Sequence, residues 1–254
     1  MNLLKKCQAP VLTFFLSCDQ STNTECFIYQ HTYMRIYDDT YRHKGMRKKL
    51  VDELKEKGIS DEKVLAAILS IPRHFFMDSA YDNIAYEDRA FPIAEGQTIS
   101  QPYTVAFQSS LLQIQPTDKV LEIGTGSMYQ ATILAALGAK VFTIERQKNL
   151  FENTRKYIFQ SKYPQLKFFY GDGFQGLPTY APFNKIIITA GAPVVPPMLI
   201  KQLKVGGLMV IPLNEGAQQR MLRITKISDT ETSEEAFSNF SFVPMLEGRA
   251  KPIK

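Results

Sequence analysis

The sequence predicts an α/β fold, a mostly parallel β-sheet with helices on both faces, from three observations. Residues 120–130 read as an apolar strand, a turn with two glycines and the start of a helix, and a second apolar strand follows over 141–145. Strand and helix patterns continue to alternate as far as residue 212. Residues 185–189 form an almost unbroken apolar run, which is typical of a strand buried on both faces of a parallel sheet.

Helical patterns precede the first strand. Apolar residues recur at helical spacing over 46–58 and 60–72, and Gly58 and Pro72 mark the ends of these two helices. A loop-rich stretch follows and leads into a helix over 103–113. Both the helices and the loop therefore lie ahead of the sheet.

Strands and helices also follow residue 145, and the chain ends in what reads as an antiparallel pair with a solvated acidic turn between its strands. The expected elements are a helix over 149–161, strands over 166–170 and 185–189, a helix opened by Pro196 and Pro197, a strand over 208–212, and the closing pair 220–227 and 240–246 around the turn 231–235.

The strand–turn–helix unit at 120–130 has the features of a nucleotide-binding site. Gly124 and Gly126 lack a Cβ, so the backbone there can pass close to a ligand. The helix beginning near Tyr129 directs its free N–H groups toward the same place. About 20 residues beyond the turn, Glu145 ends the second strand, where its carboxylate can accept both hydroxyls of a ribose.

The spacing of the turn indicates which nucleotide is favoured. A dinucleotide fingerprint needs a third glycine at position 129, where this chain has tyrosine, so an NAD site is disfavoured. The pattern E-x-G-x-G-x-G of S-adenosylmethionine sites fits better, with Glu122, Gly124 and Gly126 present and Met128 at the last position. The alternative is that a parallel α/β protein of another kind carries two glycines after a strand.

Composition and charge exclude several classes of protein. The 254 residues can bury a full core, and a hydrophobic content of 44% with 22% charged residues is ordinary for a globular protein. No apolar run approaches the length of a membrane span. The net charge of +5 is dispersed, with one basic triplet at 47–49, so we expect no nucleic-acid partner. No Cys/His spacing resembles a zinc site, and we expect no metal.

Residues 1–45 differ from the rest of the chain. They hold all three cysteines, Cys7, Cys18 and Cys26, which excludes a disulfide framework for the remainder. We expect a disordered extension or a weak leader here, or an upstream stretch ahead of a true start at Met46, and one domain over 46–254.

Seven short motifs occur in order between residues 46 and 246. They are Ile-Pro-Arg-His-Phe at 71–75, Phe-Pro-Ile at 91–93, Gly-Gln-Thr-Ile-Ser-Gln-Pro at 96–102, Leu-Glu-Ile-Gly-Thr-Gly-Ser at 121–127, Thr-Ile-Glu-Arg at 143–146, Gly-Asp-Gly at 171–173 and Phe-Val-Pro at 242–244. Together they resemble the protein-L-isoaspartate O-methyltransferase family. The glycine motif alone would indicate only a methyltransferase, whereas the motif at 96–102 is the specific part.

The resemblance implies a Rossmann-like S-adenosylmethionine-dependent methyltransferase sheet and the repair of damaged proteins and peptides that carry isoaspartate. It implies that Ser100 contacts the substrate carboxylate and that the cofactor is held by Glu122, Gly124, Gly126, Glu145, Asp172, Gly173 and Thr189. In the family pattern Glu145 holds the ribose, Asp172 and Gly173 lie beside the adenine, Thr189 and Ala190 sit near the reacting groups, and Val243 is close to the substrate backbone.

The individual residues also have simpler readings. Ser100 precedes Pro102 and a helical run, as a helix N-cap does. Asp172 between two glycines is a common turn, and Glu145 could be an exposed acid at a helix start. Met128 and Ala94 stand where the family usually has glycine, and we expect the site to accommodate Met128.

The expected reaction needs no general base, because a carboxylate with a pKa of roughly 4 is ionised at pH 7 and a sulfonium methyl group is electrophilic. We expect a monomeric cytoplasmic enzyme. The alternatives are another S-adenosylmethionine-dependent carboxyl methyltransferase and a catalytically silent binding protein of the same fold.

Overall fold

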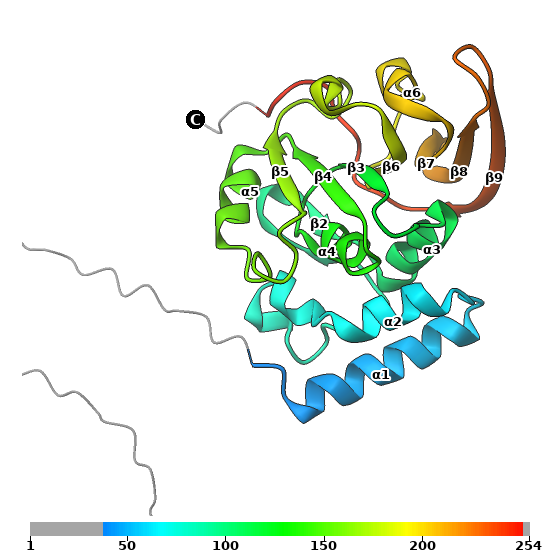
Figure 1. Ribbon diagram of the computed structural model, residues 1–254. Helices are drawn as coiled ribbons and strands as arrows, with labels where there is room; N and C mark the ends of the chain where they lie inside the picture. The colour runs from blue at the N-terminus through cyan, green and yellow to red at the C-terminus, as the bar shows by residue number, and fades with distance from the viewer. Residues whose placement is uncertain (1–37, 251–254) are drawn as a thin grey trace, which may run out of the picture. The chain divides into compact units, whose positions relative to one another are not determined.

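A seven-stranded sheet with the order β5-β4-β3-β6-β7-β8-β9 forms the centre of the computed structural model, which describes residues 38–250 (Figure 1). Strands β5, β4, β3, β6 and β7 are parallel, and β8 and β9 continue the sheet antiparallel. The strands are β3 (Lys119–Ile123), β4 (Lys140–Glu145), β5 (Lys167–Tyr170), β6 (Phe183–Ile188), β7 (Leu203–Glu215), β8 (Gln218–Lys226) and β9 (Thr232–Phe240). The predicted α/β class is confirmed.

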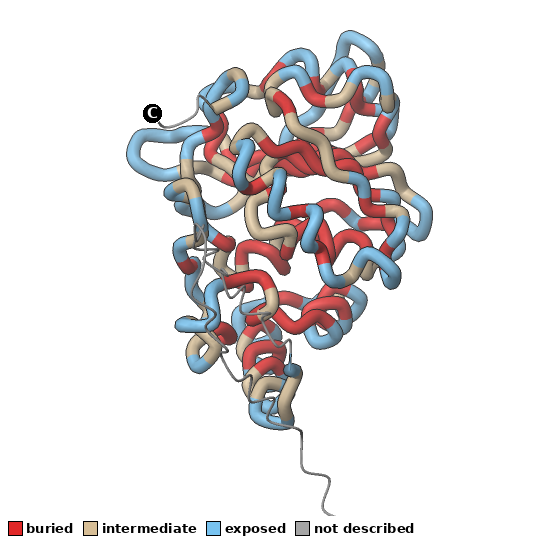
Figure 2. The backbone as a smooth tube through the Cα atoms, turned by 90° about the vertical axis from the view of Figure 1, so that its left-hand side faces the viewer, coloured by how far each residue is buried: buried red, intermediate tan, exposed pale blue. Residues whose placement is uncertain are grey.

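Helices cover both faces of this sheet, and each face has its own apolar core. One core joins the sheet to α1, α2, α3 and α4, and the other packs α6 and the loops before β6 against the opposite face. Figure 2 shows the buried strands running through the middle of the molecule. The helices are α1 (Tyr41–Glu56), α2 (Glu62–Ser70), α3 (Pro102–Leu112), α4 (Tyr129–Ala136), α5 (Lys148–Asn153) and α6 (Pro197–Gln202).

Short elements fill the loop between α2 and α3, where the sequence predicts irregular structure. They are the 3-10 helices η1 (Arg73–Phe76), η2 (Ser79–Tyr81) and η3 (Ala94–Gly96), and the two-residue strands β1 (Phe91–Pro92) and β2 (Thr98–Ile99), which pair with each other. Two further 3-10 helices, η4 (Thr154–Lys156) and η5 (Pro178–Tyr180), lie later in the chain. The loop between α2 and α3 thus ends with the short strand β2, directly before Ser100.

Helix α1 begins at Tyr41, five residues before the expected start at Met46. Thr40 caps it, because its side chain accepts a hydrogen bond from the backbone N–H of His43, whose ring nitrogen lies 3.4 Å from the Thr40 backbone nitrogen. For α2 the cap is Asp61, whose side chain accepts hydrogen bonds from two backbone N–H groups. The division of the chain at residue 45 stays a prediction, and the predictions for the cysteines and the leader lie outside the described residues.

The closing antiparallel pair differs from the prediction. β9 covers 232–240, so the expected acidic turn at 231–235 is largely strand and the expected strand at 240–246 is largely loop. β9 is an edge strand with mostly exposed side chains, so it lacks the apolar alternation by which strands are recognised. Its pairing with β8 is supported by an ion pair of 2.7 Å between Arg223 and Glu235.

The helix expected over 149–161 is also shorter than predicted. α5 ends at Asn153 and continues as the 3-10 helix η4 to Lys156. Beyond it Tyr157 is buried in the core, and the ring of Phe159 stacks on that of Phe76 with 5.7 Å between centroids. These tertiary contacts hold the residues after Lys156 in a non-helical conformation.

Candidate active site

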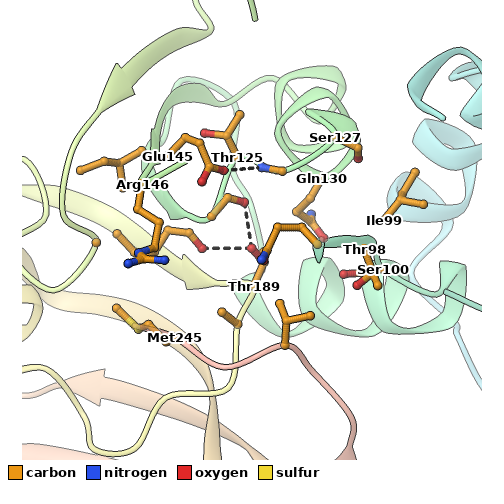
Figure 3. Close-up of a pocket in the computed structure, with 18 of the residues that line it drawn as sticks. Thr98, Ile99, Ser100, Thr125, Ser127, Gln130, Glu145, Arg146, Thr189 and Met245 are labelled. Carbon is orange, nitrogen blue, oxygen red and sulfur yellow. Dashed lines mark hydrogen bonds between the residues drawn. The ribbon is translucent and has the colours of Figure 1, made fainter. Parts of the chain in front are cut away.

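A cavity opens at the carboxyl ends of β3, β4 and β6 (Figure 3). The chain runs from β3 to β4 and β5 on one side and then crosses to β6 on the other side of β3, and ligands bind at such a reversal of strand order in open α/β sheets. The lining residues come from the loop before α3, the turn after β3, the ends of β4 and β6, and the segment after β9. They are residues 97–100, Val105, 123–127, Tyr129, Gln130, 144–146, Gly173, Thr189, Ala190 and 243–246.

The glycine turn forms the floor of this cavity. Gly124 has φ +100°, a conformation that L side chains rarely adopt, and its N–H donates to the carbonyl of Ile144 at 3.0 Å. The hydroxyl of Thr189 lies over the turn and donates to the carbonyls of Ile123 (3.0 Å) and Gly124 (2.9 Å). A Cβ on Gly124 would lie 2.6 Å from that hydroxyl oxygen, so the turn has no room for a side chain.

Glu145 ends β4 with its carboxylate at the cavity wall. One oxygen accepts the N–H of Gly126 at 2.9 Å and the other accepts the N–H of Gln147 at 2.8 Å. Burial raises the pKa of the Glu145 carboxyl, and these two N–H donors counteract part of that effect. Glu145 therefore ties the glycine turn to β4 and leaves lone pairs that can accept hydroxyl groups.

The structure brings most of the predicted site residues together. Ser100, Gly124, Gly126, Glu145, Gly173 and Thr189 all line the cavity, as do Ala190 and Val243. Asp172 is not part of the lining, and its carboxylate accepts a hydrogen bond of 2.9 Å from the N–H of Phe174. This contact matches the turn reading of Asp172.

Glu122 lies behind the turn and does not line the cavity. It is fully buried in β3, and side chains alternate along a strand, so it points to the same face as Val120, toward the core that contains α3 and α4. Within residues 38–250 neither of its carboxyl oxygens has a hydrogen-bond partner. Burial raises the pKa of Glu122 to about 8, the nearby Thr143 side chain offsets part of this rise, and the charge of Glu145 adds to it.

The buried carboxyl of Glu122 predicts a pH-dependent stability. The pKa of Glu122 is higher in the folded than in the unfolded chain. The contribution of this carboxyl to the free energy of unfolding is therefore fully present below about pH 4.5 and is lost as the pH rises to about 8. Relative to Glu122→Gln, the free energy of unfolding of the wild type should fall with pH by up to about 1.4 kcal/mol per unit in that window. Urea titrations of both proteins between pH 5 and 9 measure this, and a constant difference would contradict it.

Met128 leaves the cavity open. It precedes α4 with φ +73°, the left-handed conformation in which glycine is common, and its side chain packs against the apolar core rather than lining the cavity. Whether the site accommodates Met128 when a ligand binds stays a prediction. Ala94 opens the 3-10 helix η3 and is likewise absent from the lining.

Several lining residues were not predicted. Arg146 is the last residue of the Thr-Ile-Glu-Arg motif but was not predicted to line the site, and its side chain donates to the carbonyl of Gly248 at 3.1 Å. Met245 carries no local signal, because it reaches the site only through the backbone pairing of its segment with Gly191, whose N–H donates to the carbonyl of Val243 at 2.8 Å. Gln130 is the second residue of α4, and no local pattern distinguishes it from the other helical residues.

A second cleft adjoins the first. It shares Thr98, Ser100, Thr189 and Val243 with the cavity and has a volume of about 570 Å³. Its remaining lining residues are Ala90, Gln101, Tyr103, Thr104, Gln218 and 238–242, and none of them is charged. Ser100 therefore stands at the junction of a cavity with a carboxylate wall and an uncharged cleft.

One group in the described part of the chain has the composition of a metal site, namely Asp39, His43 and His74. Its carboxylate is held by both nitrogens of the Arg47 fork, at 2.9 and 3.0 Å. The two imidazole rings stack with 3.9 Å between centroids, which is unsuited to in-plane coordination of one ion by both. The absence of a metal stays a prediction.

Comparison with known proteins agrees with this geometry. The family model described as protein-L-isoaspartate(D-aspartate) O-methyltransferase matches residues 45–250. A protein-L-isoaspartate O-methyltransferase of Christiangramia forsetii is 55% identical over 211 residues, which is 83% of this chain and 99% of the relative. One of Cytophaga hutchinsonii is 53% identical over 209 residues, covering 82% of this chain and 94% of the relative.

Two solved structures share the fold of this chain. A protein-L-isoaspartate O-methyltransferase superimposes with a TM-score of 0.71 and 28% identity, covering 78% of this chain and 65% of that one. A Plasmodium falciparum protein assigned to the same activity, determined with S-adenosyl-L-homocysteine, has a TM-score of 0.69 and 24% identity and covers 79% of this chain and 98% of that one. The chain belongs to the protein-L-isoaspartate(D-aspartate) O-methyltransferase family.

Proposed function

We propose that this protein transfers a methyl group from S-adenosylmethionine to the free carboxylate of L-isoaspartyl residues in damaged proteins and peptides. The observation that carries the proposal is the position of Ser100, which lines both the cavity with the glycine turn and the adjoining uncharged cleft. A donor in the first and a peptide in the second would meet at this residue.

The first cavity suits S-adenosylmethionine. The Glu145 carboxylate offers lone pairs to ribose hydroxyls, and the turn at 124–126 brings backbone close enough to hold the amino-acid part. Gly173 lies against Ile123, where an added Cβ would overlap a methyl carbon of Ile123, so the wall for the adenine is apolar and tightly fitted. Glu122 and Asp172 would then act on the shape of the site and not by touching the cofactor.

We place the peptide in the second cleft. Its lining offers amide, hydroxyl and backbone groups next to the aromatic rings of Tyr103, Phe240 and Phe242. Such a surface can hold an extended peptide backbone without selecting a charged side chain. This absence of charge also speaks against a nucleic-acid partner, which would require basic groups.

The residues of the site position the reacting groups and need not move a proton. S-adenosylmethionine supplies a methyl group on a sulfonium, and the acceptor carboxylate is ionised at neutral pH. In the described part of the chain no group is hydrogen-bonded to the hydroxyl of Ser100, so it is available to donate to the carboxylate. Ser100 would orient the attacking oxygen while leaving it charged.

Replacing Ser100 with alanine should lower kcat about 10- to 100-fold, because it removes a hydrogen bond to a charged group. Binding of S-adenosylhomocysteine, measured by calorimetry, should be nearly unchanged. Ser110→Ala is the matched control, since the Ser110 hydroxyl donates to the carbonyl of Ala106 within α3. Equal turnover of Ser100→Ala and wild type would remove Ser100 from the mechanism.

The function itself is tested with a labelled methyl group and paired isoaspartyl and aspartyl peptides. Base-labile label on the isoaspartyl peptide alone is expected. Label on another carboxylate would indicate a different carboxyl methyltransferase, and no label on any acceptor would indicate a silent binding protein.

We further propose a cytoplasmic monomer. Within residues 38–250 no helix is both long and apolar enough to cross a bilayer. The large apolar side chains that are exposed are scattered along the described chain from Tyr41 to Leu246. Sedimentation of the full-length chain at several concentrations tests the monomer, and cell fractionation tests the compartment.

A further inference from the structure

We propose that Arg73 is a positioning residue, which holds the segment 85–100 and with it Ser100 in the geometry needed for methyl transfer. The inference rests on the proposed function of Ser100. Arg73 belongs to the Ile-Pro-Arg-His-Phe motif at 71–75, and no residue of that motif lines either the cavity or the second cleft. The motif therefore has a role that contact with ligands does not explain.

The guanidinium of Arg73 is hydrogen-bonded to three carbonyl groups of the segment 85–100. One terminal nitrogen donates to the carbonyl of Ala85, and the other donates to those of Arg89 (3.2 Å) and Ser100 (3.0 Å). Two of these carbonyls lie in the first five residues of the segment, and the third is at its last residue. One rigid planar group thus fixes the distance between the start of the loop and the active-site serine.

This arrangement is unusual for a buried charge. Arg73 is fully buried, and within residues 38–250 it forms no ion pair, while its Nε has no hydrogen-bond partner. Burial lowers the pKa of Arg73 to about 10, so the group is still protonated at neutral pH. Burying a cation against carbonyl dipoles alone is costly, so stability is a poor reason for an arginine here.

The rings around the guanidinium connect it to the cavity as well. It lies over the ring of Phe91, 5.4 Å from the centroid, and 5.9 Å from the centroid of Tyr129. Phe91 belongs to β1, and Tyr129 opens α4 and lines the cavity. Arg73 is therefore packed between the segment that carries Ser100 and the helix that follows the glycine turn.

Within residues 38–250 Arg73 is the side chain that donates to the carbonyl of Ser100, whereas the neighbouring contacts act through Asp88, which accepts from the Gln101 side chain at 3.1 Å and pairs with Lys57 at 2.6 Å. The pairing of β1 with β2 involves only two residues on each side, and Glu95 in the bend between them has φ +60°. Asp88 anchors the other side, where its carboxylate accepts the N–H of Tyr103 at 2.7 Å. Without the guanidinium, the carbonyl of Ser100 would lose its donor from the protein interior.

Kinetics of Arg73→Met and Arg73→Lys in the full-length chain test the proposal. In Arg73→Met, kcat/KM for an isoaspartyl peptide should fall about 100-fold, as expected when a reacting group is displaced by about 1 Å. In Arg73→Lys the fall in kcat/KM should be smaller, because an ammonium group keeps the charge but lacks the planar fork of the guanidinium. The dissociation constant for S-adenosylhomocysteine should be nearly unchanged in both.

A double-mutant cycle with Ser100→Ala separates positioning from general damage. If Arg73 acts through Ser100, removing the hydroxyl should lower kcat much less in Arg73→Met than in the wild type, because the hydroxyl is already misplaced. If Arg73→Met does not fold, the same cycle with Arg73→Lys decides. Loss by the same factor in both backgrounds would overturn the proposal.

Arg47→Met is the matched control. Arg47 is also a buried arginine, and it donates to the carbonyl of Leu69 at 2.7 Å and to the hydroxyl of Tyr86 at 2.9 Å. It touches the segment 85–100 only at this side chain near its start and makes no hydrogen bond to Ser100. The Arg47→Met variant should be less stable than the wild type but should keep its kcat/KM. Adding Ser100→Ala to this variant should lower kcat by the same factor as in the wild type. Equal losses of activity in the two arginine variants would overturn the positioning role. Activity of the wild type on the isoaspartyl peptide decides the proposed function separately.

Discussion

Glu145→Gln is expected to raise the dissociation constant for S-adenosylhomocysteine about 30- to 100-fold. The carboxylate accepts N–H groups from Gly126 and Gln147 and has further lone pairs at the cavity wall. The glutamine side chain ends in an amide, whose NH₂ group would face the N–H of Gly126 or of Gln147 and could not accept a hydrogen bond from it. The amide also has no negative charge to strengthen hydrogen bonds from the hydroxyl groups of a ribose. Hydrogen bonds to a charged group contribute about 1.5–3 kcal/mol each, and loss of one such contact gives a change of this size.

Isothermal titration calorimetry measures this effect directly. Glu152→Gln is a suitable control, because Glu152 lies in α5 outside the cavity lining, is about half exposed and within residues 38–250 forms only a long ion pair of 3.9 Å with Lys148. The dissociation constant of Glu152→Gln for S-adenosylhomocysteine should match that of the wild type. If Glu145→Gln bound as tightly as Glu152→Gln, the assignment of Glu145 to the ribose would be wrong.

The central part of the site could be predicted because its signals are local in the sequence. A strand, a turn that requires glycine and an acid at the end of the next strand are separated by fixed short distances. Gly124, Gly126 and Glu145 therefore meet wherever that unit folds. The same locality explains why the α/β class was predicted correctly.

The remaining wall depends on contacts between distant residues. Met245 reaches the cavity because its N–H donates to the carbonyl of Gly191 at 2.8 Å, and nothing near position 245 encodes that pairing. The segment 240–246, which contains Met245, was wrongly predicted as a strand, because its local pattern does not show this distant pairing. Arg73 lies 27 residues before Ser100, the residue whose carbonyl it holds, and a buried arginine cannot be distinguished in the sequence from an exposed one.

Membership of a motif does not specify the direction of each side chain. Glu122 belongs to the glycine motif, yet the alternation of β3 turns it away from the cavity and into the core. A motif therefore predicts where a segment lies more reliably than which of its side chains touch the ligand.

Gly124→Ala is expected to abolish cofactor binding and to lower the free energy of unfolding by about 2–4 kcal/mol, because two costs act together. The φ of +100° strains any residue with a Cβ, and the added methyl carbon would be 2.6 Å from the Thr189 hydroxyl oxygen. Relief of that contact would displace Thr189, whose hydroxyl donates to the carbonyls of Ile123 and Gly124. The turn that forms the floor of the cavity would therefore move.

Gly58→Ala separates the two costs. Gly58 has φ +94°, close to that of Gly124, but a Cβ there would meet no atom within 4 Å. Its loss of stability, from urea unfolding, reports backbone strain alone, and it should bind S-adenosylhomocysteine normally. The excess loss in Gly124→Ala then measures crowding, which Thr189→Ala in the same chain should partly relieve. Equal losses for the two glycine variants, with binding retained in both, would mean that the close approach of Thr189 to the turn is not what excludes a side chain at position 124.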